Sequence, residues 1–217
     1  MLVRDVMKQP VITMKKEDTI QNAIHLLKKH HIRHIPIINE EDNVIGIVSD
    51  RDIRDVSPST LEQSTQANIF SEPISKIMTS PVITIHPNES FDEVASIFYD
   101  KEFACVPVVA NQKLVGMVTE KDMLYTFIQF TGTSQPSTQI VVKVPDQVGV
   151  LTEISNIFTQ RNIKIVSVYT YPLPATAGYK QLIFRIQTMN PIPVINDLKQ
   201  SNYELIDPIR EDSNEFM

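Results

Sequence analysis

The sequence predicts an α+β/α/β protein made of two repeated β-α-β-β-α units, followed by a ferredoxin-like unit of order βαββαβ. Two repeated segments carry the first part of this prediction. Met-Lys-Gln-Pro-Val-Ile-Thr at 7–13 recurs 71 positions later as Met-Thr-Ser-Pro-Val-Ile-Thr at 78–84. Gly-Ile-Val-Ser-Asp-Arg-Asp at 46–52 recurs as Gly-Met-Val-Thr-Glu-Lys-Asp at 116–122. Two copies of one unit predict a pseudo-twofold module with its chemistry near the contact between the copies.

Each repeat has the same expected order of elements. Short strands at 11–13 and 82–84 lead into helices whose apolar residues recur every three or four positions, from Ile20 and from Phe91. Two apolar strands and a second helix complete each unit. The pairs expected to start the first helices are Asp18 with Gln21 and Ser90 with Glu93.

The third unit begins after a polar linker and has a different order of elements. Strands are expected at 140–144, 163–171, 179–188 and 203–209, with helices at 150–161 and 192–200. The predicted domain limits are 1–56 and 75–130 for the repeats, 57–74 for their connector, 131–138 for the linker, 139–210 for the third unit and 211–217 for an acidic tail.

The composition is that of a soluble globular protein. The chain has 217 residues, 42% of them hydrophobic and 21% charged, and a net charge of -6. This charge argues against a protein held to nucleic acid mainly by phosphate contacts. Cys105 is alone and cannot form an internal disulfide, and no apolar run reaches the roughly 20 residues of a membrane span. We expect a cytoplasmic protein without nucleic-acid or membrane partners.

The sequence Gly-x-x-Ser/Thr-x-x-Asp stands in both repeats where a strand passes into a helix. Ser49 with Asp52, and Thr119 with Asp122, fit a capping box, which is the purely structural interpretation. The same arrangement suits a nucleotide, because a helix N-terminus favours phosphate and an aspartate one turn later can accept both hydroxyls of a ribose. Its occurrence at matched positions in both repeats favours the nucleotide site.

On these residues the two repeats resemble a tandem pair of CBS domains, regulatory modules that bind adenosyl compounds. The resemblance rests on the segments 7–13 and 78–84, on the pairs Ile35-Pro36 and Val106-Pro107, and on the two Gly-x-x-Ser/Thr-x-x-Asp sequences. It implies two clefts that bind an adenine nucleotide or S-adenosylmethionine. The implied contacts are ribose at Asp52 and Asp122, phosphate or ribose at Ser49 and Thr119, and the base at the backbone around Thr13, Ile35, Thr84 and Val106.

The two clefts are expected to differ in charge. Arg33, His34 and Arg51 surround the first, and Ala104, Cys105 and Lys121 hold the matching positions of the second. We therefore predict that a charged nucleotide prefers the first cleft, although solvated surface charge would also explain these residues. The early histidines, His25, His30, His31 and His34, lack the further ligands of a metal site, so no metal is predicted.

The third unit resembles an ACT domain, a small ligand-sensing module. The resemblance rests on Val-Pro-Asp-Gln-Val-Gly-Val-Leu at 144–151 and on Asn-Ile-Lys-Ile at 162–165. It implies a dimer and an amino acid or other small metabolite at the turn formed by Asp146, Gln147, Val148, Gly149, Val150 and Leu151. A ferredoxin-like domain used for dimerisation alone is the alternative.

A CBS pair followed by an ACT domain resembles the acetoin utilization (AcuB) proteins, which implies a link to acetoin or butanediol catabolism. The sequence contains no Gly-x-Ser-x-Gly elbow, no P-loop and no metal-ligand spacing, so an enzyme is the least favoured interpretation. We expect a non-catalytic sensor that forms a homodimer and regulates another protein. The alternative is an interaction scaffold without a ligand.

Overall fold

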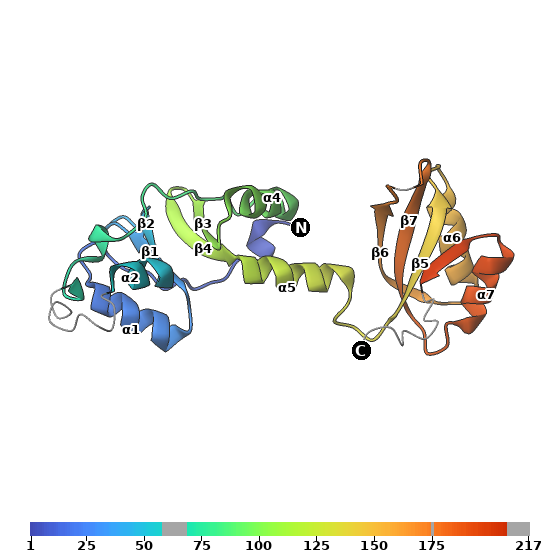
Figure 1. Cartoon of the computed structure of the whole chain (residues 1–217), viewed down its shortest axis with the longest axis horizontal. Coiled ribbons are helices and arrows are strands. Elements are labelled where there is room, and N and C mark those ends of the chain that lie inside the picture. Colours follow the sequence, from blue (N-terminus) through green and yellow to red (C-terminus); the bar gives the residue numbers. More distant parts are fainter. Residues whose placement is uncertain (58–68, 175, 208–217) are drawn as a thin grey trace. The chain divides into compact units, whose positions relative to one another are not determined.

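The computed structural model describes residues 1–57, 69–174 and 176–207 and divides into two compact units, Met1–Leu124 and Tyr125–Met217. Most of the expected connector, the acidic tail and the end of the last strand lie outside the described residues. The elements from the repeats are η1 (Val3–Asp5), α1 (Ile20–His30), β1 (His34–Ile38), β2 (Val44–Ser49), α2 (Asp50–Val56), η2 (Ile74–Lys76), α4 (Phe91–Lys101), β3 (Cys105–Ala110), β4 (Lys113–Thr119) and α5 (Glu120–Thr131) (Figure 1).

Each repeat is built on one antiparallel hairpin, β1 with β2 and β3 with β4. The lead-in segments, 7–13 and 78–84, do not form regular strands. Single parallel bridges follow them instead, from Met14 to Ile37 and from Ile85 to Val108. The expected order of elements is otherwise present in both repeats, with the first strand of each reduced to this bridge.

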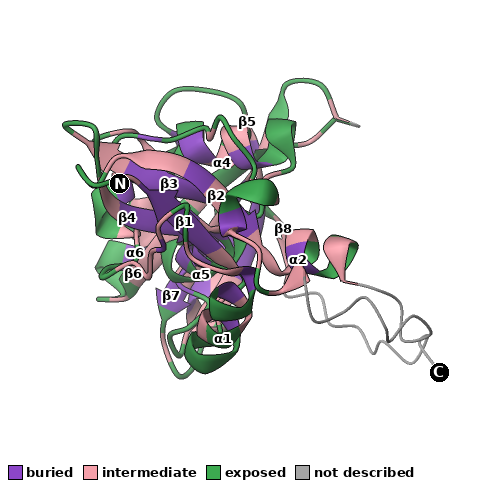
Figure 2. Ribbon diagram, turned by 90° about the vertical axis from the view of Figure 1, so that its left-hand side faces the viewer, coloured by how far each residue is buried: buried purple, intermediate pink, exposed green. Residues whose placement is uncertain are grey.

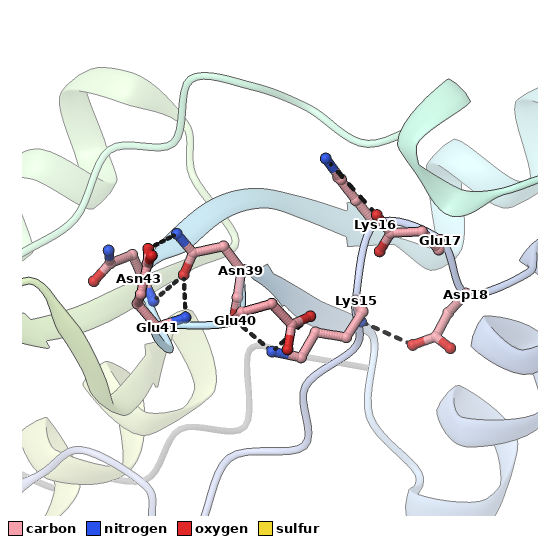
Figure 3. A network of polar contacts seen from close by, with 8 residues as sticks. All are labelled: Lys15, Lys16, Glu17, Asp18, Asn39, Glu40, Glu41 and Asn43. Atoms are coloured by element: carbon pink, nitrogen blue, oxygen red, sulfur yellow. Dashed lines mark hydrogen bonds and ion pairs between the residues drawn. The ribbon is translucent and has the colours of Figure 1, made fainter.

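The β1–β2 turn is closed by an asparagine. The Asn39 side-chain oxygen accepts hydrogen bonds from the backbone N–H groups of Glu41, at 3.0 Å, and Asn43, at 2.8 Å. Lys15 lies just after the first lead-in segment and pairs with Glu40 at 3.8 Å (Figure 3). The pair places Lys15 beside the β1–β2 turn, at the end of the hairpin opposite Ser49.

The repeats exchange their first residues. Val3 is fully buried in the core of the second repeat, and its N–H donates to the Glu89 carbonyl at 3.0 Å. Ile74, at the matching position of the second repeat, is fully buried in the core of the first, and its N–H donates to the Asp18 carbonyl at 2.7 Å. Each core is therefore completed by the other repeat, and Figure 2 shows β1 and β3 among the buried elements.

The second unit has the expected ferredoxin-like order. Its elements are β5 (Thr138–Pro145), α6 (Val150–Gln160), β6 (Lys164–Pro172), β7 (Tyr179–Gln187), α7 (Ile192–Gln200) and β8 (Glu204–Asp207). The four strands form one antiparallel sheet in the order β6-β7-β5-β8. One face of this sheet and both helices enclose a core in which the Phe158 and Phe184 rings meet edge to face at 4.9 Å.

Candidate functional site

The first candidate site lies where β2 passes into α2. Ser49 caps the helix, and its hydroxyl accepts the Asp52 backbone N–H at 3.2 Å. The Ser49 N–H donates to Asp52 Oδ2 at 2.6 Å, and the Ser49 hydroxyl donates to the same oxygen at 2.7 Å. This is the capping box expected from the sequence, and it fixes the carboxylate at the helix N-terminus. Asp52 Oδ1 has no hydrogen-bond or ion-pair partner among the described residues.

The second repeat builds the same arrangement where β4 passes into α5. The Thr119 N–H and hydroxyl donate to Asp122 Oδ2 at 3.0 and 2.6 Å, and the Asp122 N–H donates to the Thr119 hydroxyl at 3.3 Å. The two sites differ in the remaining carboxylate oxygen. Lys8 Nζ lies 3.1 Å from Asp122 Oδ1. Asp122 is only 7% exposed, whereas Asp52 is half-buried.

The residues around Asp52 carry the expected positive charge. His34 lies opposite Ser49 in the hairpin, and the Arg33 carbonyl accepts the Asp50 N–H at 2.9 Å, which places position 33 beside the start of α2. Arg33 and Arg51 are both exposed. Two exposed basic residues therefore lie at the start of α2, the helix whose N-terminus carries the open Asp52 carboxylate and the Ser49 hydroxyl.

Burial is the main influence on the titration of His34. It lowers the pKa of this imidazole from its usual value, against the opposing effects of the Asp50 and Asp52 carboxylates. Arg33 also lowers this pKa, and Glu120 of the second repeat raises it. The neutral imidazole is therefore favoured in the folded protein.

At the matching positions the second site has one basic residue, Lys121, and Lys8 brings a further cation to Asp122. The Ala104 carbonyl accepts the Glu120 N–H at 3.2 Å, as Arg33 does for Asp50 in the first repeat. Cys105 lies opposite Thr119 in the hairpin and is buried, and this burial raises the pKa of its thiol to about 12. Lys121 is exposed. The matching positions therefore hold fewer basic residues than those of the first repeat, while Lys8 lies at Asp122 and no lysine lies at Asp52 among the described ion pairs.

The positions expected to contact the base fall in two classes. Ile35 and Val106 are 0% and 1% exposed, so their side chains belong to the cores and only their backbone can face a ligand. Thr84 is exposed. Thr13 lines a hollow of about 760 Å³ between the repeats, and the other residues of its wall are Gln9, Pro10, Val11, Ile38, Asp42, Lys113, Leu114 and Val115. No other residue predicted for the two clefts lines this hollow.

The turn before α6 forms the candidate site of the second unit. Asp146 pairs with Lys180 at 2.7 Å, and its N–H donates to the Gly178 carbonyl at 2.9 Å. Gly149 has φ +97°, a left-handed conformation that suits glycine, and the helix begins at the next residue. The remaining residues of this predicted site differ in exposure: Gln147 and Val148 are exposed, Val150 is buried and Leu151 is 45% exposed.

Lys8 is the site residue that the motif analysis missed. Its signal was present, because the two lead-in segments agree at five positions and differ at Lys8 against Thr79 and at Gln9 against Ser80. The exchange of first residues between the repeats, which periodicity does not reveal, brings this lysine to Asp122. Within the described ranges, no three His, Cys, Asp or Glu side chains are grouped to hold a metal ion.

Comparison with known proteins identifies both modules. The CBS domain model matches residues 3–59 and 74–128, which together make up more than half of the chain. The chain belongs to the CBS domain family. The ACT domain model matches residues 138–201, so this tandem CBS pair is followed by an ACT domain. Among the described helices of this CBS protein, none is long and apolar enough to cross a membrane.

Three curated relatives each match little more than half of this chain. L-aspartate semialdehyde sulfurtransferase of Methanocaldococcus jannaschii is 35% identical over 127 residues, 58% of this chain and 23% of that enzyme. Homoserine O-acetyltransferase of Methanococcus vannielii is 29% identical over 126 residues, 58% of this chain and 24% of that enzyme. The CBS domain-containing protein YhcV of Bacillus subtilis is 29% identical over 121 residues, 56% of this chain and 81% of YhcV. The match therefore spans less than a quarter of each enzyme.

Two solved structures resemble the CBS pair. The CBS domain pair of protein MJ0100, in complex with 5′-methylthioadenosine and S-adenosyl-L-methionine, has a TM-score of 0.51 and 33% identity, and covers 62% of this chain and 98% of that one. A putative acetoin utilization protein (AcuB) from Vibrio cholerae has a TM-score of 0.54 and 28% identity, and covers 63% of this chain and 98% of that one. The fold assignment rests on these matches together with the element order, and the two-module organisation rests on the CBS and ACT domain models.

Proposed function

We propose that this protein is a regulatory sensor that binds an adenosyl compound in its CBS clefts, with the first cleft as the principal site. The observation that carries the proposal is the open Oδ1 atom of Asp52, which lies beside the Ser49 hydroxyl at the start of α2. A carboxylate with a free oxygen can accept hydrogen bonds from the hydroxyls of a ribose.

The charge around this carboxylate favours a phosphorylated ligand. Arg33 and Arg51 are exposed cations beside the helix start, and guanidinium groups bind phosphate through paired N–H donors. In the bound state Asp52 would hold the ribose, and one or both arginines would bind the phosphate. The backbone at Thr13 and Ile35 would pack on the base. We expect AMP, ADP or ATP to prefer this cleft, and a neutral adenosyl compound to bind with less discrimination.

The relatives support a regulatory role in two ways. The CBS pair of MJ0100 was solved with two adenosyl compounds, which supports the same ligand class here. The matched segment makes up less than a quarter of two enzymes with different reactions, which suits a module that senses rather than catalyses. The likeness to AcuB of Vibrio cholerae supports the proposed link to acetoin catabolism.

The ACT domain extends the proposal to a second ligand and to a homodimer. We assign an amino acid or another small metabolite to the turn around Gly149, where Val148 and Leu151 expose apolar side chains. Apolar side chains exposed in this way suit a contact with a second copy of the chain. We place the homodimer in the cytoplasm, where it would pass ligand occupancy on to a partner protein.

The test is calorimetric titration of AMP, ADP, ATP, S-adenosylmethionine and 5′-methylthioadenosine into the wild type and into Asp52→Asn and Asp122→Asn. Asparagine keeps one acceptor for the Ser49 N–H but cannot accept the hydrogen bonds that a carboxylate accepts from two hydroxyls. Because a hydrogen bond to a charged group contributes about 1.5–3 kcal/mol, we expect Asp52→Asn to raise the Kd of the tighter site roughly tenfold to a hundredfold.

The matched control is Glu93→Gln. Glu93 closes the capping box of α4 with Ser90, outside both proposed clefts, so this variant perturbs a capping box without touching a ligand. Binding unchanged in both Asp52→Asn and Asp122→Asn would refute the ribose assignment. If no adenosyl compound bound to the wild type, the scaffold without a ligand would replace the sensor.

A further inference from the structure

We propose that Lys8 controls access of a ribose to the second cleft. Its ammonium group is paired with Asp122 Oδ1, whereas the corresponding Oδ1 of Asp52 in the first cleft is open. This inference rests on the proposed function, because it assumes that the two aspartates are the ribose acceptors. It assigns the difference in ligand preference between the clefts to one residue outside the Gly-x-x-Ser/Thr-x-x-Asp sequences.

The backbone of the first lead-in segment holds Lys8 in place. The Lys8 N–H donates to the Met117 carbonyl at 2.8 Å, and the Met117 N–H donates to the Lys8 carbonyl at 3.2 Å. These two hydrogen bonds fix residue 8 on β4, five residues before Asp122. The ammonium group then lies 3.1 Å from Asp122 Oδ1.

The first cleft contains the same backbone arrangement with a different side chain. The Thr79 N–H donates to the Ile47 carbonyl at 2.8 Å, and the Ile47 N–H donates to the Thr79 carbonyl at 3.1 Å. Ile47 is five residues before Asp52, as Met117 is before Asp122. Thr79 has no charge and a short side chain. The repeats therefore form a natural comparison in which position 8 is basic and position 79 is not.

The consequence for a ligand follows from counting acceptors. Asp122 Oδ2 already accepts two hydrogen bonds from Thr119, and Oδ1 is paired with Lys8, so Oδ1 keeps a single free acceptor position. A ribose that donates both of its hydroxyls to Oδ1 must displace the ammonium group. The Lys8 side chain is 70% exposed, so solvent screens the pair and the barrier is small. We expect Lys8 to weaken ribose binding at this cleft by about twofold to fivefold.

The experiment isolates each cleft and exchanges the two residues. 5′-Methylthioadenosine is the probe, because it is neutral and its affinity does not depend on a phosphate contact. In an Asp52→Asn background, which leaves the second cleft, Lys8→Thr is expected to tighten binding by about twofold to fivefold, and Lys8→Arg to leave it unchanged. In an Asp122→Asn background, which leaves the first cleft, Thr79→Lys is expected to weaken binding by a similar factor. Thr79 shows that this backbone position accepts threonine.

The salt dependence of binding distinguishes this electrostatic role of Lys8 from a purely structural one. Raising the salt concentration screens the Lys8–Asp122 pair, so affinity for the neutral probe at the second cleft should rise with salt when Lys8 is present and stay constant in Lys8→Thr. Binding at the second cleft that is unchanged or weaker in Lys8→Thr would overturn the inference while leaving the sensor proposal intact. Failure of the probe to bind at either cleft in any variant would overturn both.

Discussion

The sulfur of Met78 lies 2.5 Å from the position that a Cβ atom on Gly46 would occupy. The other repeat contains the same contact, with the sulfur of Met7 2.6 Å from a Cβ placed on Gly116. Neither glycine has a positive φ, so what glycine provides here is space for the methionine and not a special backbone conformation. Each methionine, from the lead-in segment of one repeat, packs on the strand of the other. The glycine of the Gly-x-x-Ser/Thr-x-x-Asp sequence therefore serves the contact between the repeats.

Gly46→Ala should destabilise the first unit by about 1–3 kcal/mol, the usual cost of overpacking a close contact. Urea denaturation followed by circular dichroism measures the effect. Met78→Ala removes the atoms that an added methyl would meet, so Gly46→Ala should cost less in that background. Equal costs in both backgrounds would show that the methionine is not the obstacle.

Cys105 should resist alkylation in the folded protein. Burial raises the pKa of its thiol to about 12, and the thiolate is the nucleophilic form. At pH 8, iodoacetamide should therefore leave the native thiol unmodified and modify it fully in 6 M guanidinium chloride, as mass spectrometry of the intact chain would show. Modification of the native protein as fast as that of the unfolded chain would contradict the buried position of this side chain.

The first residues of α1 and α4 show how much of a helix boundary can be predicted from local sequence. Ser90 and Glu93 form the expected capping box of α4. The prediction was wrong for α1, whose N-cap is Thr19, while the Asp18 carboxylate accepts the Lys15 N–H at 2.8 Å. Threonine and aspartate are both good N-caps. Which of two adjacent residues caps the helix depends on contacts with the rest of the fold, which the local sequence does not show. The position of a helix was therefore easier to predict than its first residue.

The candidate site divides in the same way between local and long-range features. Ser49, Asp52 and their counterparts in the second repeat follow from spacing within a few residues, and the structure joins each pair by hydrogen bonds. Lys8 reaches Asp122 from a distant part of the chain, because the lead-in segment of one repeat lies against the strand of the other. The sequence of one repeat alone gives no sign of this contact. A comparison of the two lead-in segments does, because Lys8 stands where the second repeat has Thr79.

His34 should make the free energy of unfolding depend on pH. Burial places its folded-state pKa below the value of 6.5 expected in the unfolded chain, so between these two values the unfolded chain binds more protons. The contribution of the neutral imidazole is therefore fully present above pH 6.5 and lost as the pH falls through the folded-state pKa. Urea denaturation at several pH values should show a smaller fall in stability toward pH 5 for His34→Gln than for the wild type.

The exposed face of α5 is a second apolar surface, besides Val148 and Leu151 of the ACT turn, at which the proposed homodimer can be tested. Leu124, Phe127 and Ile128 are 62%, 57% and 37% exposed, and their i, i+3 and i+4 spacing puts them on one side of the helix. Burying such a stripe against a second copy would remove apolar surface from water, whereas a charge at its centre would oppose association.

Phe127→Glu should therefore lower the mass measured by light scattering after size exclusion from that of a dimer toward that of the 24.7 kDa monomer. Gln129→Glu is the matched control, since it adds the same charge to the same helix on a side away from the stripe, and it should remain dimeric. Because Phe127 is exposed in the single chain, its replacement should leave the free energy of unfolding of that chain nearly unchanged. A wild type that is monomeric at micromolar concentration, or a Phe127→Glu variant that dimerises like the wild type, would exclude this face as the interface.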